Sequence, residues 1–121
     1  MAIKVLVIDD SDMVRHFHGN ILKSSGFEAD GAIDGMDALE KAVQNNYALM
    51  LCDLNMPRMD GITFIKEYRK TGKETPIIII TTQEELENRR MGYESGANLY
   101  ITKPVKPDDL ILNIKMLLGI I

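Results

Sequence analysis

The chain has 121 residues, and its 14 Lys and Arg against 18 Asp and Glu give a formal net charge of -4. This length predicts a single domain, residues 1–121, with its own core. The acidic balance argues against broad electrostatic binding to nucleic acid. No apolar run reaches the roughly 18 residues of a membrane span, and the N-terminus lacks a secretory pattern. Cys52 has no second cysteine to pair with, so we expect a cytoplasmic protein without a membrane anchor.

Apolar, β-branched runs alternate with amphipathic segments along the whole chain. The runs predict strands over residues 3–8, 27–32, 48–52, 77–80 and 98–102. The predicted helices lie between Asp12 and Gly26, between Gly35 and Asn45, between Gly61 and Gly72, over 84–94, and from Pro107 onward. Strands that alternate with helices indicate an α/β fold, in which right-handed crossovers place helices on both faces of a parallel sheet. We therefore expect a doubly wound, flavodoxin-like (βα)5 fold with a five-stranded sheet of order 2-1-3-4-5.

The spacing of apolar residues predicts which side of each helix is buried. The expected stripes are Val14, Phe17 and Ile21, then Met36, Leu39 and Val43, then Ile62, Ile65 and Tyr68, and finally Leu110, Ile111, Ile114 and Leu117. His16 and His18 lie two residues apart, so they point to different faces of a helix and make a poor metal pair. We expect both histidines at the surface.

Polar side chains follow four of the predicted strands, at the point where each strand ends. Asp9 and Asp10 come after the first strand and Asp53 after the third. Thr81 follows the fourth strand and Lys103 the fifth. Because the carboxyl ends of parallel strands meet at one edge of the sheet, these side chains are expected to share a crevice.

Three carboxylates in one crevice repel one another, and a cation among them removes the repulsion. An all-oxygen site suits Mg²⁺, to which the backbone carbonyl of Asn55 can add a ligand. Lys103 and Thr81 can bind the oxygens of a phosphoryl group. Asp53 is the best candidate for a nucleophile that forms an aspartyl phosphate, because the two aspartates after the first strand are placed as metal ligands.

In this order and at these strand ends, the residues resemble the receiver domain of two-component response regulators. The similarity runs from about Ile3 to Leu118 and is greatest to the small stand-alone chemotaxis response regulator. The matching residues are Asp9-Asp10, the segment Asp53–Gly61, Thr81, Gly96-Ala97 and Lys103-Pro104.

The resemblance implies a phosphorylation-activated switch of a two-component phosphorelay. Asp53 would accept a phosphoryl group from a histidine kinase or a phosphotransfer protein. The implied Mg²⁺ ligands are Asp9, Asp10, Asp53 and the Asn55 carbonyl, with Thr81 and Lys103 on the phosphoryl oxygens. The domain would catalyse its own phosphorylation and dephosphorylation rather than act as an enzyme on other substrates.

The resemblance also implies a switch residue and an output face. Tyr100 matches the aromatic switch position and would turn inward when Thr81 moves toward the phosphate. The output face would be the fourth helix, the fifth strand and the fifth helix. The Lys103–Pro104 bond is expected to be cis. Gly92, inside the fourth helix, costs about 1 kcal/mol against alanine and is expected to loosen that helix.

Three alternatives stay open at this stage. A flavodoxin-like cofactor binder would carry Ser, Thr and Gly in its first loop, whereas Asp9-Asp10-Ser11-Asp12 repels a phosphate that lacks a metal. A phosphatase with an aspartyl nucleophile usually has a second acid two residues later, where this chain has Asn55. The chain can also be the receiver portion of a larger regulator.

Overall fold

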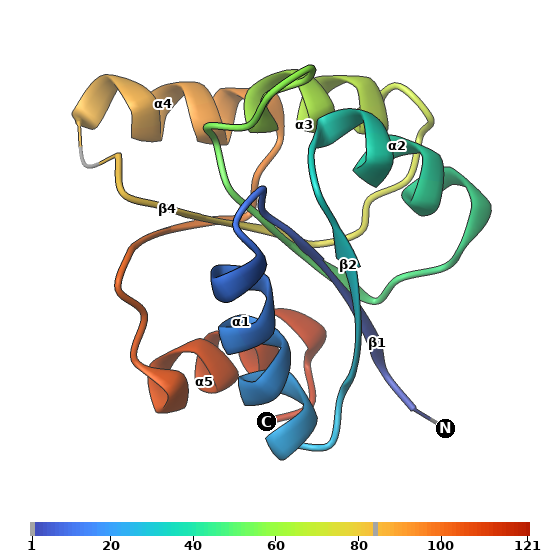
Figure 1. Cartoon of the computed structure of the whole chain (residues 1–121), viewed down its shortest axis with the longest axis vertical. Coiled ribbons are helices and arrows are strands. Elements are labelled where there is room, and N and C mark those ends of the chain that lie inside the picture. Colours follow the sequence, from blue (N-terminus) through green and yellow to red (C-terminus); the bar gives the residue numbers. More distant parts are fainter. Residues whose placement is uncertain (1, 84) are drawn as a thin grey trace.

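The computed structural model describes residues 2–83 and 85–121, and its described strands form one parallel sheet in the order β2-β1-β3-β4-β5 (Figure 1). The strands are β1 (Lys4–Ile8), β2 (Glu28–Ala32), β3 (Leu49–Cys52), β4 (Ile77–Thr81) and β5 (Leu99–Thr102). The predicted fold class and strand order are therefore confirmed. Four of these strands begin one residue later than the sequence predicts.

Helices cover both faces of this sheet. They are α1 (Asp12–Ser24), α2 (Gly35–Gln44), α3 (Gly61–Arg69), α4 (Leu86–Ser95) and α5 (Pro107–Leu118). Figure 1 shows α2, α3 and α4 on one side of the sheet and α1 and α5 on the other. The helix predicted over 84–94 begins at Leu86 and ends at Ser95, one residue after its predicted end. Glu84 lies outside the described residues. Within the described chain, no helix combines the length and apolar character needed to cross a membrane.

The sheet separates two apolar cores, because successive strand residues point to opposite faces. Strand residues such as Leu6, Met50 and Ile79 pack under α2, α3 and α4, together with Phe64 and Tyr100. The alternate strand positions pack against α1 and α5. That second core contains Val5, Leu51, Ile78, Leu22, Val105, Leu110 and Ile114.

Parallel pairing aligns the carboxyl ends of the strands. The N–H of Asp9 donates to the last carbonyl of β2 at 3.1 Å, and the N–H of Asp53 donates to Ile8 at 3.0 Å. At the other side of the sheet, the N–H of Lys103 donates to the carbonyl of Thr81 at 2.8 Å. The residues that follow the strands therefore leave the sheet at one common edge.

Three helices that begin at this edge have a side-chain N-cap. Ser11 accepts from the N–H of Val14 at 3.3 Å, and Asp60 accepts from the N–H of Thr63 at 2.8 Å. Asp34 caps α2 in the same way. Each cap satisfies an N–H group that would otherwise have no partner in the first turn. Asp60 is thus the N-cap residue of α3.

The buried stripe predicted for α1 is wrong at Phe17, although Ile21 packs against the core as predicted. Phe17 is 47 % exposed, whereas His18 is 4 % exposed, and His18, Gly19 and Leu22 form the buried face. The surface position predicted for His18 is therefore also wrong, while His16 is exposed as expected. Phe17 instead lines an open groove together with Met13, His18 and Lys103.

The stripe predicted for α2 is wrong at Met36 and Val43. Met36 and Val43 are 50 % and 55 % exposed, while Ala38 and Ala42 are fully buried. Alanine lets the backbone of a helix approach the sheet closely, so the small side chains face inward. Leu39 is half-buried against the same core.

Candidate functional site

Three aspartates converge where β1 and β3 end. Asp9, Asp10 and Asp53 each offer a carboxylate oxygen, and these oxygens all lie within 4.8 Å of one another. Asp9 is 3 % exposed and Asp53 is 8 % exposed, whereas Asp10 is open to solvent. The structure thus brings together the three acids that the sequence placed in one crevice.

Lys103 reaches into this cluster from the segment after β5. Its Nζ lies 2.8 Å from Oδ2 of Asp9 and 3.3 Å from Oδ2 of Asp53. Burial disfavours the ammonium, but the two carboxylates outweigh burial and raise the pKa of Lys103 above its ordinary value. Lys103 is therefore a fixed positive charge at neutral pH, directly beside Asp53.

The two oxygens of Asp53 have different partners. Oδ1 accepts from the N–H of Leu54 at 2.8 Å, and Oδ2 faces the ammonium of Lys103. Burial raises the pKa of Asp53, and neighbouring Asp9 adds to that rise, while Lys103 and the Leu54 N–H oppose it. Asp53 is thus a carboxylate held in one orientation in a partly desolvated site.

Thr81 and Tyr100 are linked through Gln83, in the segment after β4. Thr81 is fully buried, and its Oγ1 accepts from the N–H of Gln83 at 3.3 Å. Tyr100 is 4 % exposed, and its hydroxyl donates to the carbonyl of Gln83 at 2.6 Å. Tyr100 therefore lies inward in this structure. Asn55 is exposed in the loop after β3, and its role as a ligand stays a prediction.

His18 is a neighbour of the site that the sequence did not place there. With Asp9 and Asp53, it lines a closely packed space under the strand ends. Burial lowers the pKa of His18, and the positive charge of Lys103 lowers it further. The imidazole is therefore neutral at physiological pH. The available signal was Leu22, four residues later, which places His18 on the same helix face as a core leucine.

The loop after Asp53 folds back on itself and contacts α2. The N–H of Gly61 donates to Leu54 at 2.9 Å, and the N–H of Gly35 donates to the carbonyl of Met59 at 2.9 Å. Arg58, at the apex, has the left-handed φ of 66°. A non-glycine residue rarely adopts that φ without compensating contacts.

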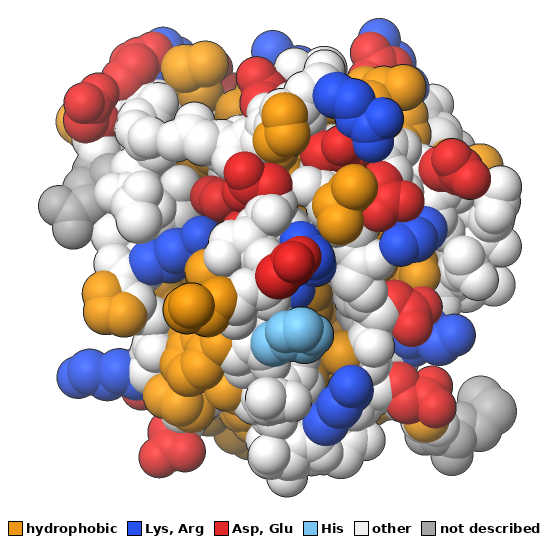
Figure 2. All heavy atoms as spheres, in the orientation of Figure 1, with side chains coloured by type: hydrophobic (Ala, Val, Ile, Leu, Met, Phe, Trp, Pro, Cys, Tyr) orange, Lys and Arg blue, Asp and Glu red, His pale blue; other side chains and the backbone are white. Residues whose placement is uncertain are grey.

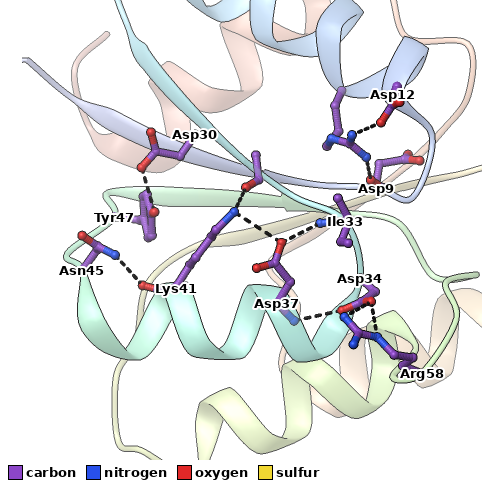
Figure 3. Close-up of polar contacts among 12 residues, drawn as sticks. Asp9, Asp12, Asp30, Ile33, Asp34, Asp37, Lys41, Asn45, Tyr47 and Arg58 are labelled. Carbon is purple, nitrogen blue, oxygen red and sulfur yellow. Dashed lines mark hydrogen bonds and ion pairs between the residues drawn. The ribbon is translucent and has the colours of Figure 1, made fainter.

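An ion pair with Asp34 supplies such a contact. Nε of Arg58 donates to Oδ2 of Asp34 at 2.6 Å, while Oδ1 of Asp34 accepts from the N–H of Asp37 at 2.9 Å (Figure 3). Burial acts to raise the pKa of Asp34, but the N–H of Asp37 and the Arg58 guanidinium hold that pKa below its ordinary 3.8. One buried carboxylate therefore anchors both α2 and the loop that carries Asn55.

Asp34→Ala is expected to lower the free energy of unfolding by about 1–2 kcal/mol at neutral pH, because α2 loses its cap and Arg58 its partner. A carboxylate whose pKa is lowered by folding stabilises at pH values above the unfolded pKa and loses that effect as pH falls through the folded value. The deficit should thus shrink in acid, below the ordinary pKa of 3.8. Urea unfolding at about pH 7 and about pH 3 measures it.

Asp34→Asn is the matched control for that prediction, because it keeps a cap acceptor and removes the titrating charge. Its deficit should be smaller and nearly independent of pH. Equal deficits for Asp34→Ala at both pH values would contradict the role given to the Asp34 charge.

The acidic cluster has the donor chemistry that Mg²⁺ requires. All three side chains offer oxygen, and the exposed position of Asp10 leaves room for the waters that Mg²⁺ retains. The repulsion among the carboxylates is only partly balanced by Lys103, which carries a single charge against three. The residues present therefore fit a divalent cation.

Comparisons with known proteins agree with this geometry. The family model for the response regulator receiver domain matches residues 5–115. The transcriptional regulatory protein SrrA of Staphylococcus aureus is 42 % identical over 118 residues, which are 98 % of this chain and 48 % of SrrA. The chain thus spans about half the length of the curated relatives it matches.

Solved structures of similar length to this chain have the same fold. The receiver domain of the Francisella response regulator 1452 is 36 % identical, with a TM-score of 0.91 and 96 % of each chain covered. The chemotaxis protein CheY4 of Vibrio cholerae is 34 % identical, with a TM-score of 0.90, over 96 % of this chain and 98 % of CheY4. This chain therefore belongs to the receiver domains of two-component response regulators, which are switches controlled by phosphorylation of an aspartate.

Proposed function

We propose that Asp53 is the aspartate that accepts the phosphoryl group. The observation that carries this assignment is the position of its Oδ2 beside the Lys103 ammonium, within a cluster of three carboxylates. One Asp53 oxygen is held by a backbone N–H, and the other faces the Lys103 ammonium. Asp9 is more buried than Asp53, and its two oxygens accept from Lys103 and from the N–H of Ser11.

In the proposed reaction, a carboxylate oxygen of Asp53 attacks the phosphorus of a phosphohistidine. A P–O bond forms, the P–N bond breaks, and the electron pair of that bond stays on the departing imidazole nitrogen, which takes up a proton. Lys103 balances negative charge on the equatorial phosphoryl oxygens, and the Thr81 hydroxyl donates to one of them. The domain would also catalyse its own dephosphorylation, and we do not assign it other substrates.

Asp9, Asp10 and Asp53 are the side chains that would hold Mg²⁺, together with the Asn55 carbonyl. When bound, the ion neutralises the carboxylates and the incoming phosphoryl group. The protein itself contributes two further groups: the N–H of Leu54 orients Asp53, and Lys103 supplies a fixed positive charge.

The experiment that tests this function is incubation with acetyl phosphate, followed by intact mass spectrometry. We expect a gain of one phosphoryl group with Mg²⁺ present and none with excess chelator. A gain that is independent of Mg²⁺ would contradict the metal site, and no gain under either condition would contradict the proposed function.

The signal would leave the site through Tyr100. Thr81 and Tyr100 both form hydrogen bonds with Gln83, so movement of Thr81 toward a phosphoryl group would shift Gln83 and, through it, Tyr100. Tyr100 packs with α4 across the end of β5. We therefore propose the face formed by α4, β5 and α5 as the surface that an output partner reads.

The phosphodonor would dock beside Lys103, in an apolar groove of about 440 Å³ between α1 and the segment that precedes α5. Figure 2 shows hydrophobic side chains gathered over this part of the molecule. Met13 is 80 % exposed there and Phe17 47 % exposed. Because Lys103 lines both the groove and the acidic cluster, a helix bound in the groove would present its histidine to Asp53. The lining residues are Met13, Val14, Phe17, His18, Thr82, Lys103, Pro104 and Val105.

Phe17→Ala is expected to slow phosphotransfer from a kinase or phosphotransfer protein by about tenfold, because an aromatic anchor is removed from the contact. Phosphorylation by acetyl phosphate, which needs no docking, should be unchanged. Rates are measured by loss of label from the phosphorylated donor protein. Met116→Ala is the matched control, since Met116 is 60 % exposed on α5, and it should leave both rates unchanged. Equal rates for Phe17→Ala and wild type would contradict the groove as the docking site.

A further inference from the structure

Arg89, in α4, makes three contacts with β5, two of them with Tyr100. The guanidinium carbon lies 4.8 Å from the centre of the tyrosine ring, a cation–π distance. Nη1 of Arg89 points at the carbonyl of Tyr100 at 3.4 Å, and Nη2 donates to Oγ1 of Thr102 at 3.0 Å. One side chain of the helix therefore contacts the ring, the backbone and the next-but-one residue of β5.

Gly92, one turn later, brings the helix backbone against the same ring. A Cβ at this position would lie 2.7 Å from Cδ1 of Ile79 and 3.2 Å from Cδ2 of Tyr100. A side chain at this position would therefore have to displace the end of Ile79 and press on the Tyr100 ring. The structure thus gives Gly92 a packing role, while the expected loosening of α4 stays a prediction. Tyr100 is enclosed by Gly92 and Arg89 of the helix and by Ile79 of the sheet.

The neighbouring Arg90 differs from Arg89 in every contact. It lies on the outer face of α4, where it pairs with Glu87 and, at 2.7 Å, with Glu94. Exposed pairs of this kind contribute little to a fold. Arg89 instead points inward, and its guanidinium lies over the ring of Tyr100, which is only 4 % exposed. Partial removal from water strengthens such a contact.

We propose that Arg89 is a positioning residue that holds Tyr100 in its buried position and joins α4 to β5, so that helix and strand respond to the Asp53 site as one unit. This inference rests on the proposed switch role of Tyr100. The proposal adds Arg89 as the residue that sets the position of the Tyr100 side chain in the unphosphorylated protein. Without Arg89, the Tyr100 ring would exchange between a buried and an exposed position. The ratio of the buried to the exposed population would fall about tenfold.

The test is NMR of the unphosphorylated protein with ¹³C-labelled tyrosine rings, in which Tyr100 is one of four tyrosines. Wild type is expected to give a single Tyr100 signal of a buried ring. Arg89→Ala should shift that signal toward exposed values, and Arg90→Ala should leave it unchanged. Arg89→Lys should give an intermediate shift, because lysine keeps a cation but loses the planar group and its paired donors.

An unchanged Tyr100 signal in Arg89→Ala would overturn the proposal, as would equal shifts in Arg89→Ala and Arg90→Ala. If Arg89→Ala does not fold, Arg89→Lys decides the question by the same signal. A second measurement adds acetyl phosphate and Mg²⁺, which should return the Tyr100 signal of Arg89→Ala to the wild-type position. A protein that gains no phosphoryl mass refutes the proposed function, yet the first measurement still decides the role of Arg89.

Discussion

Asp53→Asn is expected to abolish the uptake of a phosphoryl group from acetyl phosphate and from any phosphohistidine donor. The amide keeps the size of the side chain and an oxygen that can accept from the N–H of Leu54, but it has no anionic oxygen to attack phosphorus. Intact mass after incubation with acetyl phosphate and Mg²⁺ should show unmodified protein. Because burial raises the pKa of Asp53, the charged form opposes folding at neutral pH, and the neutral variant should unfold at no lower temperature.

Asp60→Asn is the matched control for this experiment. Asp60 lies at the other end of the same loop and caps α3, a role that asparagine also performs. It should take up the phosphoryl group at the wild-type rate. Phosphorylation that persists in Asp53→Asn would contradict the assignment and would direct attention to Asp9 or Asp10. A loss in both variants would indicate damage to the loop rather than removal of the acceptor.

Gly61→Ala is expected to have the largest effect on stability. A Cβ at this position would overlap the backbone carbonyl oxygen of Asp53 and lie 3.0 Å from the Cα of Leu54. Backbone atoms cannot rotate away as a flexible side chain can, so the loop must shift. We expect a loss of about 2–4 kcal/mol in the free energy of unfolding, measured in urea. Because the displaced peptide belongs to Asp53 itself, phosphorylation by acetyl phosphate should slow as well.

Gly19→Ala is the control that separates this contact from the general cost of replacing glycine. Gly19 lies inside α1, and a Cβ added there would meet no neighbouring group within 4 Å. Alanine favours a helix over glycine, so this variant should gain up to about 1 kcal/mol and keep normal phosphorylation. Similar losses for Gly61→Ala and Gly19→Ala would contradict the close approach at Asp53.

The acidic cluster could be predicted because the end of each strand can be recognised from the local sequence, and the parallel sheet then brings these ends together. The apolar runs before Asp9 and Asp53 are buried strands, and parallel pairing brings their ends to one edge. Lys103 reaches the same edge for the same reason. Ser11 and Asp60 are residue types that favour the N-cap position, and capping needs only neighbours in sequence.

The contacts that the sequence did not reveal depend on how closely a helix approaches the sheet. Hydrophobicity alone assigned Phe17 to the core, but α1 turns His18 and Leu22 toward the sheet instead. In α2 the same rule overlooked Ala42, which is small and therefore buried. Arg89 has no local signal at all, because its partner lies eleven residues away on another element. Such contacts follow from tertiary packing rather than from periodicity.

The division of the interior by the sheet has a consequence for engineering this chain. Tyr100 belongs to the core beneath α2, α3 and α4, whereas Val105 of the docking groove belongs to the core beneath α1 and α5. In the proposed function, the donor groove lies on the α1 side of the sheet and the Tyr100 switch lies on the α4 side, while α5 packs beside α1 and also belongs to the proposed output face. Substitutions of groove residues on α1 are therefore expected to change the preference for a donor while the packing around Tyr100 is kept.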